Sequence, residues 1–193
     1  MIITSVENDC FQKGKKSRKK GILVEINDTA QEVRGFGGCF NELGKIALDS
    51  LNSDDAKSIM TELFSKNGCN FTFCRVGIGA NDFSVGYYSC CDSKDDYELK
   101  TFSIEREKEK LIPYIKEALN INPNIDFFAS PWTPPYWMKT SQGYAGGTII
   151  SEPKIYKTYA RYIKKYVLAI KHLASYLGQT QSFTIEVFLP VNF

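Results

Sequence analysis

The sequence predicts an α/β fold with a parallel sheet, and three observations support this. Segments with strand-like and helix-like hydrophobic periodicity alternate along the chain, in the order strand, helix, strand, helix, strand, helix, strand. The two longest polar loops, residues 77–101 and 130–152, each follow a strand, as ligand-binding loops do in α/β folds. The 193 residues are 43% hydrophobic and 24% charged, which is typical of a globular chain with a sizeable core.

The first elements are two short strands and a helix. Residues 22–26 alternate in polarity, and residues 31–34 form a second strand that runs into Gly35-Phe36-Gly37-Gly38. This glycine-rich segment lacks the spacing of a phosphate-binding loop, so it predicts a tight strand exit with close backbone packing. Ser53 is a suitable N-cap for the helix that follows. The inner face of that helix should comprise Ala56, Ile59, Met60, Leu63 and Phe64.

The alternation continues to the end of the chain. Residues 71–76 and 125–129 are apolar strand segments, and Ser103 can cap the helix between them. The buried stripe of that helix should be Leu111, Ile112, Ile115, Ala118 and Leu119. Pro153 suits the first turn of a third helix, and residues 183–189 predict one more strand. The inner stripe of the third helix should be Ile155, Tyr159, Ile163, Tyr166, Val167, Ile170 and Leu177.

The basic charge is concentrated at the start of the chain. The whole chain has 24 basic and 22 acidic residues, of which residues 1–20 hold six and two, leaving 18 and 20 for the remainder. We expect residues 1–20 to be a disordered basic leader and residues 21–193 to be one globular domain. Because that domain is net negative, we expect no nucleic-acid partner. No segment is apolar enough to span a membrane, and no signal peptide is visible.

The cysteines and the histidine argue against metal and triad chemistry. The chain has six cysteines, but four residues separate Cys69 from Cys74, and the only histidine is His172. This spacing does not fit a zinc site, and one histidine leaves little room for a Ser-His-Asp or Cys-His apparatus. We therefore expect neither a metal nor a cofactor.

Candidate ligand contacts follow two of the predicted strands. Asp82 lies in the loop after residues 71–76, where its carboxylate could accept two hydrogen bonds from sugar hydroxyls or serve as an Asx-turn residue. Residues 130–139 combine three prolines with three aromatic side chains, and flat aromatic faces suit the apolar faces of pyranose rings. We expect Trp132 to form a ligand wall and Trp137 to pack inside.

Arg75 is a cation inside a strand that should be buried. Such a charge needs a carboxylate partner. We therefore predict that Arg75 either forms a structural ion pair or lies behind a catalytic acid and tunes the pKa of that acid.

Together these segments resemble the family 30 glycoside hydrolases, the group that includes lysosomal glucosylceramidase. The resemblance runs from about residue 21 to about residue 166. The matching pieces, in order, are Gly35-Phe36-Gly37-Gly38, residues 70–75, Asp82-Phe83-Ser84, Phe102-Ser103-Ile104, residues 129–134, Trp137-Met138-Lys139-Thr140 and Ala160-Arg161-Tyr162.

The resemblance implies a fold and a reaction. It implies a (β/α)8 barrel, of which this chain holds about the first half, with an N-terminal strand belonging to a small β-sandwich. It also implies retaining hydrolysis of the β-glycosidic bond of glucosylceramide or a related β-glucoside. Two glutamates about 5–5.5 Å apart perform such a reaction. By position, Asp82 matches the carboxylate that binds glycone hydroxyls, Trp132 the tryptophan walling that subsite, and Arg75 an arginine near the catalytic glutamates. The family suggests a lysosomal or secreted protein.

The chain departs from the family at the catalytic glutamates. The family's acid/base lies in an Asn-Glu-Pro segment, whereas Glu186 falls roughly at that position between Ile185 and Val187. Residues 178–193 no longer resemble the family, and the chain ends before the nucleophile strand. We therefore expect an N-terminal fragment, inactive alone, with no catalytic residue that can be assigned. The alternative is a non-catalytic carbohydrate-binding remnant.

Overall fold

The computed structural model describes residues 32–176 and 185–187. The chain divides into two units, Met1–Arg34 and Gly35–Phe193, and every helix and strand described below belongs to the second. The predicted leader, the strand at residues 22–26 assigned to a β-sandwich, and most of the tail at 178–193 lie outside the described residues.

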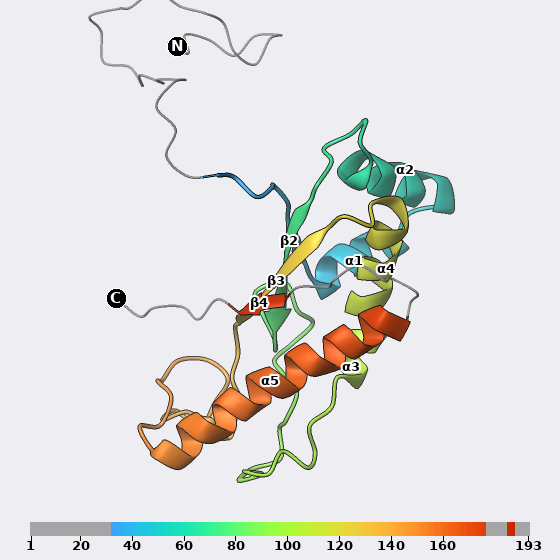
Figure 1. Ribbon diagram of the computed structural model, residues 1–193. Helices are drawn as coiled ribbons and strands as arrows, with labels where there is room; N and C mark the ends of the chain where they lie inside the picture. Colours follow the sequence, from blue (N-terminus) through green and yellow to red (C-terminus); the bar gives the residue numbers. More distant parts are fainter. Residues whose placement is uncertain (1–31, 177–184, 188–193) are drawn as a thin grey trace, which may run out of the picture. The chain divides into compact units, whose positions relative to one another are not determined.

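The sheet has four parallel strands in chain order, and this confirms the predicted fold class (Figure 1). The strands are β1 (Cys39–Phe40), β2 (Phe73–Ile78), β3 (Asp126–Pro131) and β4 (Ile185–Val187). β2 and β3 pair along their whole length, from Phe73 opposite Asp126 to Ile78 opposite Pro131. Parallel strands require long crossover connections, and helices provide them here.

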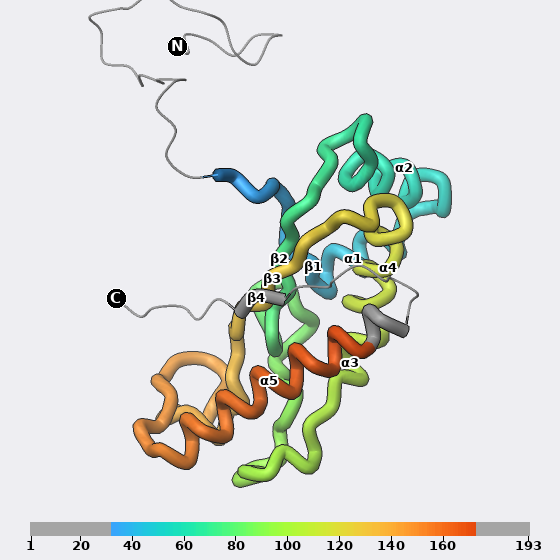
Figure 2. The backbone as a smooth tube through the Cα atoms, viewed as in Figure 1, coloured from blue at the N-terminus to red at the C-terminus, as the bar shows by residue number. Residues whose placement is uncertain are grey.

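Helices lie in each of the three connections, as the backbone path in Figure 2 shows. α1 (Glu42–Asp49) and α2 (Ser53–Phe64) connect β1 to β2, and α3 (Glu105–Glu109) and α4 (Leu111–Ile121) connect β2 to β3. After β3 come a 3-10 turn, η1 (Tyr136–Met138), and the long helix α5 (Pro153–Tyr176). None of the described helices is both long and apolar enough to cross a bilayer.

The core lies between the helices and one face of the sheet. Alternate residues of β2 and β3 are buried on this face: Cys74, Val76, Ile78, Phe127, Ala129 and Pro131. Phe40 connects the layers, because its ring stacks on Phe64 of α2 at 5.7 Å and meets Tyr114 of α4 edge-on at 4.7 Å. On the other face of the sheet, Arg75 and the two residues that pair with it, Cys39 and Phe128, are only half-buried.

The structure corrects the elements predicted around residues 31–64. Residues 32–34 do not form a strand, and β1 begins instead at Cys39. The cap of α2 is Asn52 rather than Ser53, because the Asn52 side chain accepts a hydrogen bond of 2.9 Å from the Asp55 amide. Ile59 is 42% exposed, so it does not belong to the inner face with Met60 and Phe64.

The later elements follow the prediction more closely. β2 and β3 begin two residues and one residue later than expected, at Phe73 and Asp126. All five residues predicted for the buried stripe of α4 are buried. α5 begins at Pro153, and its inner face also includes Thr158 and Tyr162, which the predicted stripe omits. β4 falls within the predicted 183–189.

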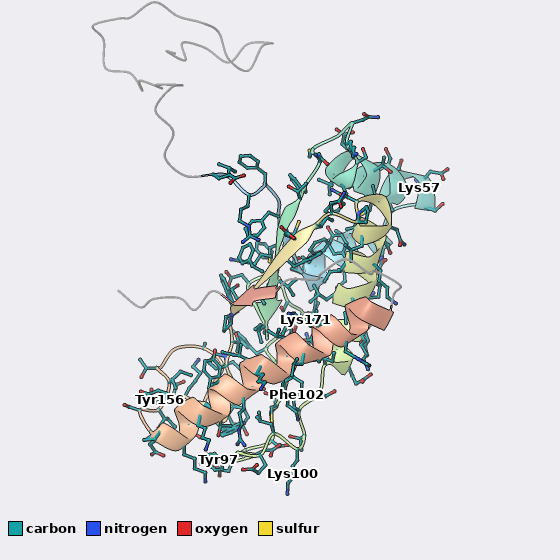
Figure 3. The ribbon with its side chains drawn as sticks, viewed as in Figure 1. Lys57, Tyr97, Lys100, Phe102, Tyr156 and Lys171 are labelled. Carbon is teal, nitrogen blue, oxygen red and sulfur yellow. The ribbon has the colours of Figure 1, made fainter. Side chains whose placement is uncertain are left out.

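The long loop after β2 packs along α5. Figure 3 shows Tyr97 and Phe102 of this loop beside the helix. The Phe102 ring meets Tyr162 of α5 edge-on at 5.6 Å. The Lys165 ammonium donates a 2.6 Å hydrogen bond to the Leu99 carbonyl. These contacts give the loop a defined path although it has no regular secondary structure.

The glycine-rich segment before β1 packs closely at Gly37, as the sequence predicts, but not at Gly38. A Cβ on Gly37 would lie 2.2 Å from the Phe73 carbonyl oxygen and 2.8 Å from the Cys74 sulfur. A Cβ on Gly38 would meet nothing within 4 Å. Neither glycine has a positive φ, so space alone distinguishes them.

We expect Gly37→Ala to lower the free energy of unfolding by about 1–3 kcal/mol, because the new methyl overpacks the backbone of β2. Gly38→Ala is the matched control and should change it by less than about 0.5 kcal/mol. Urea unfolding monitored by circular dichroism measures both. Equal effects of the two substitutions would show that the close approach to β2 does not matter.

Candidate functional site

Asp82 and Trp132 meet in one open depression at the carboxyl edge of the sheet. Its volume is about 330 Å³, within the range of about 300–1,000 Å³ found for small-molecule sites. The segments after β2 and β3 supply its lining: Ala80, Asn81, Asp82, Ser84, Gly86, Tyr87, Trp132 and Thr133. Two residues that the sequence singled out separately, 50 positions apart, therefore face the same space.

Backbone contacts hold the two segments together. The Ile78 carbonyl accepts hydrogen bonds from the Trp132 and Thr133 amides at 3.1 and 3.3 Å. The Thr133 hydroxyl donates to the Ala80 carbonyl at 2.5 Å. Gly79 has a φ of 80°, and a Cβ there would lie 2.4 Å from the Thr133 carbonyl oxygen. Only glycine fits this crossing without displacing the wall that carries Trp132.

The turn that presents Asp82 is built by its neighbours. The Asn81 side chain accepts a 2.9 Å hydrogen bond from the Phe83 amide, and the Ser84 hydroxyl accepts one of 3.0 Å from the Asn81 amide. Asn81 therefore fills the Asx-turn role that was the alternative interpretation of Asp82. The Asp82 carboxylate makes no hydrogen bond to any described residue, and its side chain is exposed in the depression.

Trp132 lies against Arg75. The guanidinium carbon of Arg75 is 4.7 Å from the centre of the indole ring, a cation–π contact, and 42% of Trp132 stays exposed. Arg75 Nε also donates to the Cys39 sulfur at 3.4 Å. Within the part of the chain that the structure describes, no carboxylate forms an ion pair with Arg75. Trp137, in contrast, is 2% exposed and donates to the Cys91 carbonyl, so it packs inside as predicted.

An ion pair holds the Asp82 turn from behind, and no feature of the sequence indicated it. Glu42 at the start of α1 is 7% exposed and accepts hydrogen bonds from Arg106 Nε and Nη2 at 2.7 and 3.0 Å. Its Oε2 also accepts the Val85 amide at 2.6 Å, and Arg106 donates to the Val85 carbonyl. We call this arrangement the Glu42–Arg106 brace. The Leu43 amide adds a 3.0 Å hydrogen bond to the Phe83 carbonyl.

Two neighbouring carboxyls have opposite pKa shifts. Burial raises the pKa of Glu42, but the Arg106 hydrogen bond, the Val85 amide and the Arg106 charge outweigh it, so its pKa lies below the ordinary 4.5. Burial raises the pKa of Glu107, which is 2% exposed, and its remaining contacts do not offset this. Cys90 donates to Glu107 Oε1 at 3.4 Å, while Oε2 has no partner among the described residues.

Glu186 shares a row of the sheet with Arg75. Arg75 pairs with Phe128 across β2 and β3, and Phe128 pairs with Glu186 across β3 and β4. In the described ranges, no group of three or more His, Cys, Asp or Glu side chains is arranged to hold a metal ion.

Comparisons with known proteins find relatives in both sequence and fold. The model of the glycosyl hydrolase family 30 TIM-barrel domain matches residues 33–182. The lysosomal acid glucosylceramidase of Mus musculus is 34% identical over 154 residues, which cover 76% of this chain and 30% of the mouse protein.

Solved structures give the same result. SrfJ from Salmonella typhimurium superposes with a TM-score of 0.69 at 33% identity, over 74% of this chain and 32% of that one. An endo-β1,6-glucanase superposes with a TM-score of 0.67, also at 33% identity, over 78% of this chain and 34% of that one. The chain thus spans about a third of the length of each of these proteins.

Glu42→Gln should weaken the brace, because it removes the charge that Arg106 and the Val85 amide share. We expect a loss of about 1.5 kcal/mol of unfolding free energy near neutral pH. Because the folded pKa of Glu42 lies below 4.5, this difference from the wild type is full above that pH. It shrinks as the pH falls through the folded pKa, which unfolding titrations between neutral and acid pH would measure.

Glu107→Gln should change the pH dependence of the unfolding free energy in the opposite direction to Glu42→Gln. Because burial raises the folded pKa of Glu107, the wild type loses stability as the pH rises above 4.5. The glutamine variant avoids this loss, so its stability relative to the wild type should increase over the same range. Parallel pH profiles for the two variants would contradict the assignment of both carboxyls.

Proposed function

Because the chain belongs to glycosyl hydrolase family 30, we propose that its depression binds the glycone of a β-glucoside, as part of a hydrolase of the glucosylceramidase type. The observation that carries this proposal is the meeting of Asp82 and Trp132 in one open space. One supplies a carboxylate with no described hydrogen bond, and the other a fixed and partly exposed indole face.

The two groups have the chemistry that a pyranose needs. A carboxylate accepts two hydroxyl hydrogen bonds, and a charged acceptor makes these bonds stronger than neutral ones. The indole face covers the apolar face of the ring. The cation–π contact with Arg75 holds the indole in place before the ligand arrives, which lowers the entropy lost on binding.

For the reaction, the proposal is retaining hydrolysis by two glutamates, with Arg75 lying near them. This chain has no Asn-Glu-Pro segment, and Glu186 in β4 stands between Ile185 and Val187. We therefore propose that the 193-residue chain binds its sugar without hydrolysing it. The missing segment is also the observation that favours the second candidate, a non-catalytic carbohydrate-binding role.

The aglycone could belong to either of two classes. One comparison protein is named a glucosylceramidase and another an endo-β1,6-glucanase, so a glycolipid and a glucan are both represented among the similar proteins. We propose a β-glucoside as the shared part, because Asp82 and Trp132 would contact the sugar rather than its substituent.

Asp82→Asn and Trp132→Ala should each weaken binding of methyl β-glucoside at least about tenfold, because each removes one of the two main sugar contacts. Isothermal titration calorimetry measures the dissociation constants. The control is Asp54→Asn, an exposed carboxylate in the first turn of α2 outside the depression. Binding that survives both site substitutions unchanged would refute the proposed site.

The purified chain should release no nitrophenol from 4-nitrophenyl β-glucoside above the rate of the uncatalysed reaction. Glu186→Gln should be indistinguishable from the wild type in this assay. Measurable hydrolysis that Glu186→Gln abolishes would instead assign Glu186 as a catalytic residue and contradict the proposed inactivity.

A further inference from the structure

A second aromatic side chain, Tyr87, lines the same depression as Trp132. It is 67% exposed, yet its ring lies parallel to that of Tyr144, with the centroids 5.9 Å apart and the planes 5° apart. We propose that Tyr87, supported by Tyr144, is a stacking platform for a second pyranose ring next to the sugar held by Asp82 and Trp132. This inference rests on the proposed function.

Tyr144 is held firmly enough to support the exposed ring. Burial, together with the nearby Asp92 carboxylate, raises the pKa of Tyr144 to about 12. Asp92 is in turn fixed by the amide and the hydroxyl of Ser89, the latter at 2.5 Å. The Tyr136 ring packs against Tyr144 with the centroids 5.7 Å apart.

The backbone of this supporting loop is also anchored. The Lys139 ammonium, in a residue that is only 6% exposed, donates to the Tyr144 carbonyl. Burial removes water from the Lys139 ammonium and lowers its pKa. The hydrogen bond to the Tyr144 carbonyl compensates for this lost hydration. A buried cation thus fixes the backbone of Tyr144, the residue against which Tyr87 stacks.

The platform borders the same depression as the two groups proposed to hold the first sugar. Tyr87 lines the depression next to Gly86, which has a φ of 80° and no neighbour within 4 Å of a built Cβ. The space beside Gly86 is therefore open, and 67% of the adjoining Tyr87 is exposed. An exposed aromatic ring that is already fixed loses little conformational entropy when it stacks on a ligand.

The chemistry of the lining favours a sugar ring over an acyl chain. Asn81, Asp82, Ser84 and Thr133 share the depression with Tyr87, so hydroxyl groups would find hydrogen-bond partners there. The tyrosine combines an apolar face with a polar tip, which matches the two kinds of surface on a pyranose. A hydrocarbon chain would instead desolvate these polar groups without replacing their hydrogen bonds.

The test compares methyl β-glucoside with the β-1,6-linked glucose disaccharide gentiobiose by titration calorimetry. The wild type should bind the disaccharide about 3- to 10-fold more tightly. Tyr87→Ala should remove this preference, measured as the ratio of the two dissociation constants, whereas Tyr87→Phe keeps the ring and should retain it. Tyr144→Ala should reduce the preference, because Tyr87 loses its support.

Each other outcome has a distinct meaning. Equal affinities for the two sugars in the wild type, or a preference that survives Tyr87→Ala, would overturn the platform while leaving the proposed sugar site intact. If neither sugar binds, the proposed function fails together with the platform. If octyl β-glucoside gains more affinity than gentiobiose through Tyr87, the platform holds an alkyl chain, and the second-ring assignment is wrong.

Discussion

The candidate site depends on the register of β2 against β3. Ile78 pairs with Pro131 at the last position of both strands, so the two chains leave the sheet side by side. The Ile78 carbonyl then accepts hydrogen bonds from the amides of both Trp132 and Thr133. A shift of one residue would turn the side chains that follow to the other face of the sheet, and Trp132 would no longer face the Asp82 loop. Gly79 completes the constraint, because no side chain fits where the two segments cross.

The site combines exposed recognition groups with buried support. Asp82 faces solvent, while the backbone of its turn is satisfied by the Glu42–Arg106 brace, by Leu43 and by the turn's own side chains. The Arg106 guanidinium also lies 4.0 Å from the centre of the Tyr88 ring. Because buried charges are costly unless fully paired, the brace is stable only when the turn is in place. The same ion pair, in which Glu42 is buried and Arg106 is half-buried, therefore stabilises the fold and fixes the position of the carboxylate that would bind sugar.

Local patterns predicted much of this structure, and long-range pairings account for most of what they missed. Helix α4 has a clean apolar stripe, and its five buried residues follow from periodicity alone. Helix α1 gave no such signal, because it buries Glu42 and Lys45 while Leu43 and Ile46 are exposed. Lys45 pairs with Asp49 one helical turn along and with Glu117 of α4, each at 2.8 Å, and the distant Glu117 cannot be read from neighbouring residues. The position and composition of the loops indicated Asp82 and Trp132, and the resemblance agreed with them, but the brace joins positions 64 apart that carry no motif.

Arg75 shows why a half-buried cation in a strand carries functional information that composition cannot supply. The sequence predicted a carboxylate partner, whereas the described contacts are an indole face and a thiol, which use Nε and the flat side of the guanidinium. An arginine has five N–H donors and stays charged at any working pH, so donors remain for an acidic partner. Its row continues through Phe128 to Glu186, and the family resemblance implies catalytic carboxylates close to this arginine. One guanidinium thus holds the Trp132 indole with its flat side, while its edge keeps N–H donors for a carboxylate.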